Sequence, residues 1–333
     1  MEILFISNTR IGDAILSTGI LNHLLTKHPH AQFTIACGEV AAPLFKFFPN
    51  LHHLYIIKKE PHNKHWLKLW KHCRKTHWHT IVDLRHSGLA LLLRAQHRYW
   101  KKPRISINPH RQWQNASLLK LSSPPPLTLW TSSDAKRFAK KHLNIIVDKR
   151  PIIAIAPAAN WHAKTWPIEN FIALIQNIMN SHGPLKNARF AISAAPSEYD
   201  GIKKLFSTAP LSRFINLIHD ISLLEVIECF KYCTLFIGND SGLMHLACAS
   251  GIPTIGLFGP TRDDLYAPIG QQCAVVRTPE SYAMLTGVKN FSSTTTPNLM
   301  QTLSVKSVLN VVNKITNNCL FSNGKMLHSS GSK

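Results

Sequence analysis

The residues with the clearest capacity for chemistry lie between Phe236 and Thr261, in the sequence FIGNDSGLMHLACASGIPTIGLFGPT. Its hydrophobic pattern predicts a buried strand, a turn at 239–242, a helix and a second buried strand. A helix that begins directly after a parallel strand presents unpaired N–H groups and the positive end of its dipole. The Ser241 hydroxyl can donate to a phosphate oxygen, and Gly242 lets the backbone come close. The stretch therefore predicts a site for a nucleotide diphosphate, with simple capping of the helix by Asp240 or Ser241 as the alternative.

A second reactive group follows the first predicted strand, which covers Glu2 to Ser7. Gly12 allows a tight turn there, and Asp13 falls in the first turn of the next predicted helix. This is the carboxyl end of a strand, where open α/β sheets bind ligands. The helix dipole favours the ionised carboxylate, so Asp13 can act as a general base toward a hydroxyl group. An N-cap role is the alternative. No G-x-G-x-x-G sequence follows the strand, so a dinucleotide fingerprint is absent.

The composition describes a folded and strongly basic protein. The chain has 333 residues, 45% of them hydrophobic, which is enough for two domains with separate cores. The 38 Lys and Arg against 17 Asp and Glu give a formal charge of +21, which predicts an anionic partner. Seven Cys without paired spacing predict free thiols in a reducing compartment. Neither a signal peptide nor an apolar run of membrane-spanning length is visible, so we expect a cytoplasmic protein.

The excess of positive charge is concentrated between Lys46 and Arg111. This segment holds fifteen Lys and Arg against Glu60 and Asp83, and tryptophans are interleaved with them or follow closely: Trp66, Trp70, Trp78, Trp100 and Trp113. Indole rings mixed with basic side chains suit a membrane interface or a phosphorylated glycolipid. They also suit single-stranded nucleic acid, or a solvated basic face over a tryptophan-containing core. Because no nucleic-acid-binding motif accompanies the charge, we expect a membrane or glycolipid partner and no nucleic acid.

Strands alternate with helices in both halves of the chain, which predicts an α/β protein with parallel sheets. We expect a first domain over residues 1–146 and a second over 150–320, joined by a linker near 144–151. Residues 321–333 are predicted to form a loose tail.

The Gly-Asn-Asp-Ser-Gly sequence that ends at Gly242, His245 after it, and the later Gly-Ile-Pro and Phe-Gly-Pro-Thr sequences form a long motif. It resembles the signature of the ADP-heptose:lipopolysaccharide heptosyltransferases, glycosyltransferase family 9. The similarity runs from Ile3 to about Pro268 and is strongest in the second half. It implies the GT-B fold, in which two Rossmann-like domains face each other across a cleft. The first domain would bind the acceptor and the second the nucleotide sugar.

The resemblance also implies roles for individual residues. Asp13 would be the catalytic base, and the acceptor would be contacted by Arg10, Gly12 and Arg85. Lys164, which precedes a Trp-Pro pair as in the family, would bind the donor's diphosphate, although Ala158-Ala159 stands where a glycine is common. The remaining donor-binding residues would be Glu198, Asp240, Ser241, Gly242, His245 and Thr261.

Two of these assignments have clear alternatives. Glu198 would accept hydrogen bonds from the ribose, but the family's neighbouring glycines are missing, and a surface Glu at a helix start fits equally. His245 would reach the phosphates or orient Asp240, and a packed core histidine is the alternative.

The implied activity is inverting transfer of heptose from ADP-heptose to the Kdo region of the lipopolysaccharide inner core, without a metal or other cofactor. The partners would be the nucleotide sugar, the lipid A core acceptor and the anionic inner face of the inner membrane, where the protein would be peripheral. Alternatives are another nucleotide sugar or core acceptor, a sugar-nucleotide epimerase of the same fold, and a non-catalytic binder of anionic glycans or lipids.

Overall fold

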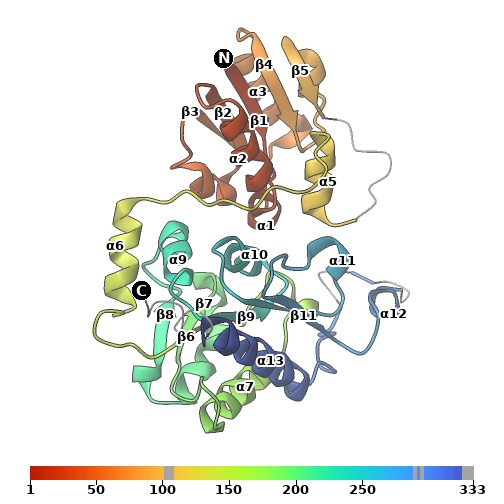
Figure 1. The fold of residues 1–333 in the computed structure, drawn as a ribbon. Coiled ribbons are helices and arrows are strands. Elements are labelled where there is room, and N and C mark those ends of the chain that lie inside the picture. The colour runs from red at the N-terminus through yellow and green to blue at the C-terminus, as the bar shows by residue number, and fades with distance from the viewer. Residues whose placement is uncertain (101–108, 288–290, 293–295, 325–333) are drawn as a thin grey trace. The chain divides into compact units, whose positions relative to one another are not determined.

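The computed structural model describes residues 1–100, 109–287, 291–292 and 296–324, and it contains two units that each enclose a parallel sheet (Figure 1). Unit 1 comprises Met1–Phe138 with Ser222–Glu228, and unit 2 comprises Ala139–Ile221 with the chain from Cys229 onward. The division falls inside a helix, before the predicted linker at 144–151. Among the described residues, no helix combines the length and the hydrophobicity needed to cross a membrane.

The sheet of unit 1 has five parallel strands in the order β3-β2-β1-β4-β5. The strands are β1 (Glu2–Ile6), β2 (Gln32–Gly38), β3 (Leu51–Ile57), β4 (Trp78–Asp83) and β5 (Ala95–Tyr99). The helices are α1 (Ile11–Ile15), α2 (Thr18–Lys27), α3 (Lys64–Cys73), α4 (Leu89–Leu92) and α5 (Arg111–Leu118), with 3₁₀ turns η1 (Glu39–Phe45) and η2 (Pro61–Asn63). Because chain order reverses between β1 and β4, the carboxyl ends of these two strands form the switch point where open sheets bind ligands.

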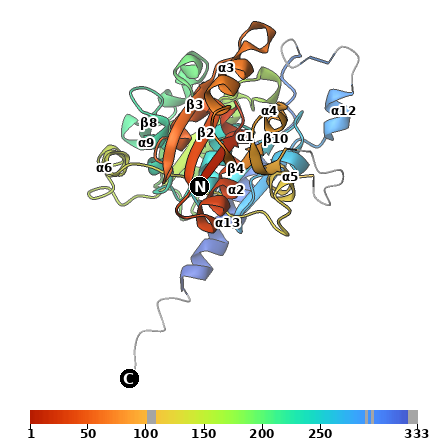
Figure 2. The ribbon, with the colours of Figure 1, turned by 90° about the horizontal axis from the view of Figure 1, so that it is seen from above.

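Both faces of the central strands β1, β2 and β4 are buried, as expected for a parallel sheet, whereas much of the edge strands β3 and β5 is exposed. Residues Ile3 to Ile6 of β1 are completely inaccessible to solvent. On one face, Leu4 and Ile6 pack in a cluster with Leu69 of α3 and Leu89 of α4. Figure 2 shows α2 on the opposite side of the sheet from α3.

The region after β1 forms two short helices rather than one continuous helix. Ser17 lies between α1 and α2, and its hydroxyl donates to the carbonyl oxygen of Ala14 at 2.7 Å. A serine that bonds a nearby carbonyl competes with the regular helical pattern. The same hydroxyl lies 3.1 Å from that of Ser7, which ties the break to the end of β1.

The sheet of unit 2 has six parallel strands in the order β11-β10-β9-β6-β7-β8. The strands are β6 (Ile152–Ala156), β7 (Arg189–Ser193), β8 (Phe214–Leu217), β9 (Leu235–Asn239), β10 (Thr254–Phe258) and β11 (Cys273–Arg277). The α-helices that lie wholly in unit 2 are α7 (Ile168–Asn180), α8 (Tyr199–Ile202), α10 (Gly242–Ala249), α11 (Asp263–Tyr266), α12 (Tyr282–Thr286) and α13 (Val305–Gly324). The division between the units falls inside two further helices, α6 (Ser133–His142) and α9 (Leu223–Phe230). The 3₁₀ turns of unit 2 are η3 (His162–Lys164), η4 (Pro196–Glu198), η5 (Lys203–Ser207) and η6 (Leu211–Arg213).

Chain order in unit 2 reverses between β6 and β9, which places the switch point at the ends of those two strands. The core packs Trp166, Phe171 and Phe190 against the sheet and α13. Helix α13 continues to Gly324, so the predicted tail begins later than residue 321, and its remainder lies outside the described residues.

Candidate active site

A cavity of about 230 Å³ lies at the switch point of unit 1. It is lined by residues that follow β1, residues that follow β4, and residues of α5: Asn8, Asp13, Leu84, Arg85, His86, Arg111, Gln114, Asn115 and Leu118. The predicted base Asp13 and the predicted acceptor residue Arg85 therefore share one cavity. Two guanidinium groups beside a carboxylate suit an acceptor that carries both anionic groups and a hydroxyl group.

The buried carboxylate of Asp83 shapes the loop that carries Arg85. One of its oxygens accepts a bond from the Arg85 N–H at 3.0 Å, and the other accepts from the N–H and the hydroxyl of Ser87, at 2.9 and 2.8 Å. His86 adopts a left-handed backbone with φ 51°, which produces a sharp turn. The turn leaves the Arg85 side chain over the ring of Trp66, with one buried Nη1 that has no hydrogen-bond partner among the described residues.

Helix α5 adds side chains that the sequence did not single out. Arg111 donates to Gln114 Oε1 at 2.8 Å, and Asn115 donates to the carbonyl oxygen of Leu16 at 3.0 Å. The Asn115 bond anchors α5 at the break between α1 and α2, beside Asp13. In the sequence, Arg111 was visible only as one basic residue among many, because its spacing to Asp13 is set by the tertiary fold.

The other two predicted acceptor residues are placed differently. Arg10 is exposed and is not among the residues that line the cavity. Gly12 lies within α1 next to Asp13, and not at one of the positive-φ positions, so the predicted tight turn is replaced by a helical turn.

The switch point of unit 2 brings together the Lys164 loop and the start of α10. Lys164 Nζ donates to the carbonyl oxygen of Asp240 at 2.5 Å and lies 3.8 Å from its carboxylate. Ser241 occupies the N-cap position of α10, but its side chain makes no capping bond, and its buried hydroxyl has no partner among the described residues. Capping by the Ser241 side chain is therefore not observed. A cation next to a helix N-terminus forms an anion-binding site.

The remaining predicted donor residues lie on neighbouring loops and on α10. Thr261 follows β10, the neighbour of β9, and its hydroxyl is buried without a partner in the described part of the chain. Gly242 begins α10, and His245 is buried in the same helix with its ring 6.3 Å from that of Tyr266. Glu198 follows β7 and accepts a bond from the Ala195 N–H at 2.8 Å, which is the local helix-start role.

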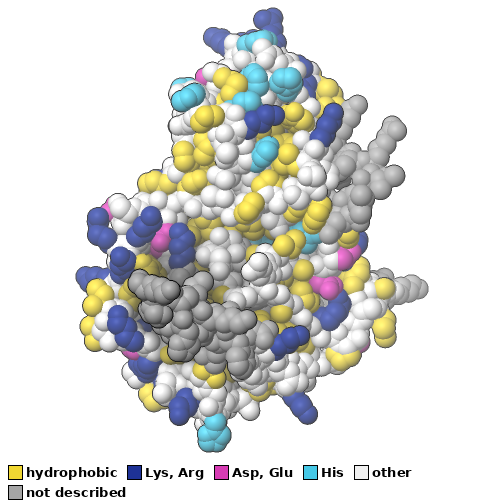
Figure 3. All heavy atoms as spheres, viewed as in Figure 1, with side chains coloured by type: hydrophobic (Ala, Val, Ile, Leu, Met, Phe, Trp, Pro, Cys, Tyr) yellow, Lys and Arg dark blue, Asp and Glu magenta, His cyan; other side chains and the backbone are white. Residues whose placement is uncertain are grey.

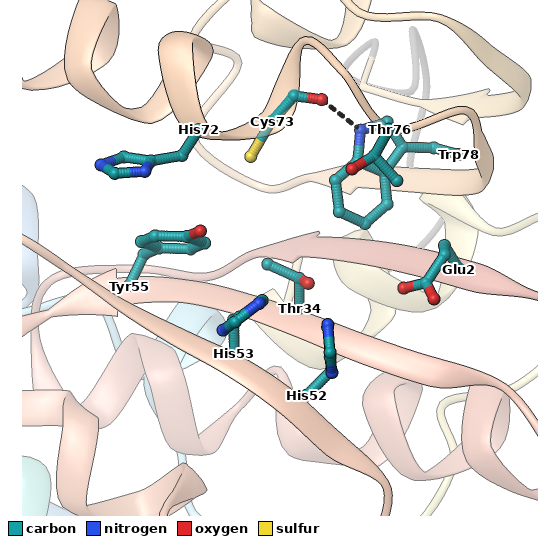
Figure 4. Close-up of a pocket in the computed structure, with 9 residues that line it drawn as sticks. All are labelled: Glu2, Thr34, His52, His53, Tyr55, His72, Cys73, Thr76 and Trp78. Carbon is teal, nitrogen blue, oxygen red and sulfur yellow. Dashed lines mark hydrogen bonds between the residues drawn. The ribbon is translucent and has the colours of Figure 1, made fainter.

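A second cavity, of about 190 Å³, lies at the opposite edge of the unit 1 sheet (Figure 4). Its lining comes from the amino-terminal parts of β1, β2 and β3 and from α3 to β4: Glu2, Thr34, His52, His53, Tyr55, His72, Cys73, Thr76 and Trp78. Within the residues that the structure describes, no group of three or more His, Cys, Asp and Glu side chains is arranged to hold a metal ion. Because this cavity lies at the edge away from Asp13, it does not belong to the candidate active site.

Comparison with known proteins identifies the family of this chain. Residues 84–293 match the family described as glycosyltransferase family 9 (heptosyltransferase). Lipooligosaccharide heptosyltransferase 2 of Campylobacter jejuni serotype O:6 is 25% identical over 283 residues, covering 82% of this chain and 86% of the relative.

Solved structures show the same fold. A family 9 glycosyl transferase from Veillonella parvula has a TM-score of 0.76 at 20% identity, covering 95% of this chain and 97% of its own. Escherichia coli ADP-heptose lps heptosyltransferase II has a TM-score of 0.71 at 16% identity, covering 96% and 99%. The predicted family, α/β GT-B fold and enzyme class are thereby confirmed. The chain belongs to glycosyltransferase family 9 and is a glycosyltransferase.

Proposed function

We propose that this protein transfers heptose from ADP-heptose to the Kdo region of the lipopolysaccharide inner core, by an inverting mechanism that needs no metal. The observation that carries the proposal is the placement of Lys164 beside Asp240, Ser241 and the N-terminus of α10 at the switch point of unit 2. This arrangement suits the diphosphate of a nucleotide sugar. The family description and the names of the similar heptosyltransferases support heptose as the sugar.

In the proposed mechanism, Asp13 removes the proton from an acceptor hydroxyl while the hydroxyl oxygen bonds to the anomeric carbon of the sugar. The bond from that carbon to the diphosphate oxygen breaks, and ADP leaves with the electron pair. Attack opposite the leaving group inverts the anomeric configuration. Lys164, the Ser241 hydroxyl and the first N–H groups of α10 stabilise the charge that develops on the diphosphate.

The test is transfer of labelled heptose from ADP-L-glycero-D-manno-heptose to Kdo-lipid A with EDTA present, comparing the wild type with Asp13→Asn. We expect the substitution to lower kcat by a factor of about 10² to 10⁴, the usual range for general-base catalysis. Binding of ADP should not change, since Asp13 is assigned to the acceptor. Absence of transfer by folded wild-type protein would overturn the donor or acceptor assignment and direct the search to other nucleotide sugars and core acceptors.

We also propose that the protein binds the cytoplasmic face of the inner membrane peripherally, through the face of unit 1 formed by α3 and α4. Lys64, Lys68 and Lys71 are exposed on α3, where Leu67 is 53% exposed, and Leu91 and Leu92 of α4 are 58% and 70% exposed. Basic side chains around exposed apolar ones suit an anionic bilayer surface. On the face of the molecule that Figure 3 shows, Lys, Arg and His are likewise more abundant than Asp and Glu.

The membrane proposal is tested by sedimentation with phosphatidylglycerol-containing vesicles, with phosphatidylcholine vesicles for comparison. The double substitutions Lys64→Glu/Lys71→Glu and Leu91→Ser/Leu92→Ser should each weaken binding. Added salt should weaken the electrostatic contribution of the lysines more than the apolar contribution of the leucines. Lys140→Glu/Lys141→Glu on α6 is the matched control for net charge. Loss of binding in this control alone, or no binding by the wild type, would contradict the proposed surface.

A further inference from the structure

A single buried amide, that of Asn239, holds both ends of the loop that carries Lys164. Asn239 is the last residue of β9 and is completely inaccessible to solvent. Its Oδ1 accepts a hydrogen bond from the Trp166 N–H at 2.9 Å, and its Nδ2 donates to the carbonyl oxygen of Pro157 at 2.9 Å. Because Pro157 directly follows β6 and Trp166 closes the loop, one side chain fixes the start and the finish of residues 157–166.

The side chain of Lys164 extends from this loop and contacts Asp240, the residue that follows Asn239. Its Nζ donates to the carbonyl oxygen of Asp240, and both side chains are almost buried, at 13% and 10% exposure. Asn239 and Lys164 thus connect the same loop to the same turn. Asn239 lies two residues before Ser241 and three before Gly242, the first residue of α10.

The other side of the loop is attached to a separate segment. Asn298 Nδ2 donates to the carbonyl oxygen of Thr165 at 2.6 Å, and the Leu299 N–H donates to that of Ala163 at 2.9 Å. These bonds hold the middle of the loop but do not reach β9. The bonds from Asn239 and Lys164 link the loop to the β9–α10 turn.

We propose that Asn239 is a positioning residue for the diphosphate site, which sets the distance between the Lys164 ammonium and the N-terminus of α10 without touching the donor. The inference rests on the proposed role of Lys164 as the diphosphate ligand. An amide fits the position because it offers one acceptor to Trp166 and one donor to Pro157. An ionised carboxylate still accepts from Trp166 but turns a negative oxygen toward the Pro157 carbonyl, so one end of the loop is released.

This chemistry supplies a specific test with Asn239→Asp. A protonated carboxyl group has the donor and acceptor arrangement of the amide, whereas the ionised form lacks the donor. In calorimetric titrations with ADP, we expect Asn239→Asp to bind about 10- to 100-fold more weakly than wild type at pH 8, the loss typical of a charge-assisted contact. The affinity should recover toward that of wild type as the pH falls and the introduced carboxyl group becomes neutral.

A double-mutant cycle separates positioning from general loosening of the fold. If Asn239 acts through Lys164, then Asn239→Asp should add less than about twofold once Lys164→Ala is present, because interacting residues are not additive. Asn298→Asp is the matched control: it likewise removes one amide donor to a carbonyl oxygen of the same loop, that of Thr165, but Asn298 does not lie in the β9–α10 turn. It should show neither the pH-dependent recovery nor the coupling to Lys164. If Asn239→Asp does not fold at pH 8, the cycle is run with Asn239→Ala.

The outcomes that overturn the inference are distinct from failure of the proposed function. Wild-type affinity for ADP in Asn239→Asp at pH 8, or additive losses in the cycle, would show that Asn239 does not position Lys164. Failure of the wild type itself to bind ADP would instead contradict the nucleotide-sugar assignment on which the inference rests.

Discussion

The guanidinium of Arg85 lies 5.3 Å from the ring centroid of Trp66 and also lines the cavity that contains Asp13. A cation over an indole face is held by the ring quadrupole, with about 0.5–1 kcal/mol at exposed sites and more where water is excluded. Since Trp66 belongs to α3, this contact joins the basic, tryptophan-containing helix to the candidate acceptor site. The tryptophan thereby orients the side chain that we assign to the acceptor.

This relationship predicts that Trp66→Leu will weaken use of the acceptor. Leucine keeps an apolar contact but removes the quadrupole, so we expect the KM for acceptor to rise about two- to fivefold, equivalent to the cation–π energy. Arg85→Ala should raise it further, and neither change should alter the KM for donor. Trp70→Leu is the matched control, because Trp70 holds Arg74 at the same 5.3 Å on the same helix and neither residue lines the cavity. Equal effects at the two tryptophans would contradict the assignment.

The sequence predicted which local segments carry functional residues better than it predicted which residues meet in the folded protein. The alternation of strands and helices, the position of Asp13 after β1 and the turn at Asp240 to Gly242 follow from local patterns, which a sequence displays directly. Arg111 and Asn239 were not assigned roles, because their partners lie far away in the chain and depend on which strands become neighbours. Capping of α10 by the Ser241 side chain, which was the alternative to a phosphate site, is not observed, and the local pattern alone could not exclude it.

The carboxylate of Asp148 makes the stability of unit 2 depend on pH. Hydrogen bonds from the Arg150 side chain, together with the nearby charge of Arg189, lower the pKa of Asp148 from 3.8 to about 2. Because the pKa of Asp148 is lower in the folded than in the unfolded state, its ionisation stabilises the fold at pH values above the unfolded-state pKa. This contribution is lost as the pH falls from about 4 to about 2. Arg189 is almost fully buried, and its Nε lies 3.1 Å from this carboxylate. The negative charge of Asp148 therefore compensates the buried positive charge of Arg189.

We therefore expect Asp148→Asn to lower the free energy of unfolding by about 1–2 kcal/mol at pH 7, allowing for the partial exposure of the carboxylate. The difference from wild type should shrink at pH 3, and urea titrations at the two pH values measure both quantities. Asp134→Asn removes an ion pair with Arg137 in which both side chains are more than three-quarters exposed, so its effect should be near zero. A deficit for Asp148→Asn that persists unchanged into acid would contradict the linkage.

Gly38 packs against Thr9, in the loop between β1 and Asp13, so closely that no side chain fits there. A Cβ atom added at Gly38 would lie 2.6 Å from Thr9 Cα and 2.8 Å from its carbonyl oxygen, which forces backbone to move. Gly38→Ala should cost about 1–3 kcal/mol of unfolding free energy, as overpacking does, and should lower kcat because the loop shifts. Gly201→Ala is the control, since nothing lies within 4 Å of an added Cβ and alanine favours its helix α8. If Gly38→Ala changed neither the free energy of unfolding nor kcat, the loop would be able to move without cost, which contradicts this prediction.

The thiols of Cys248 and Cys273 predict selective reactivity in unit 2. The two sulfur atoms lie 3.8 Å apart, and the hydrogen bond from the Cys273 thiol lowers the pKa of Cys248. Burial raises the pKa of Cys37 and of Cys73 to about 12, and both are inaccessible to reagents. Since the thiolate is the nucleophile, partly exposed Cys248 should be alkylated first by iodoacetamide near neutral pH, among the cysteines whose side chains are described.

Peptide mapping by mass spectrometry at short reaction times measures this order. Cys273→Ala removes the hydrogen bond that stabilises the Cys248 thiolate, so it should slow alkylation of Cys248 and shift its pH dependence upward. Cys73→Ala alters a buried thiol in unit 1 and should leave the rate unchanged. Modification of Cys37 or Cys73 ahead of Cys248 in the folded protein would contradict the assignment, because a buried thiol with a raised pKa reacts only after local opening.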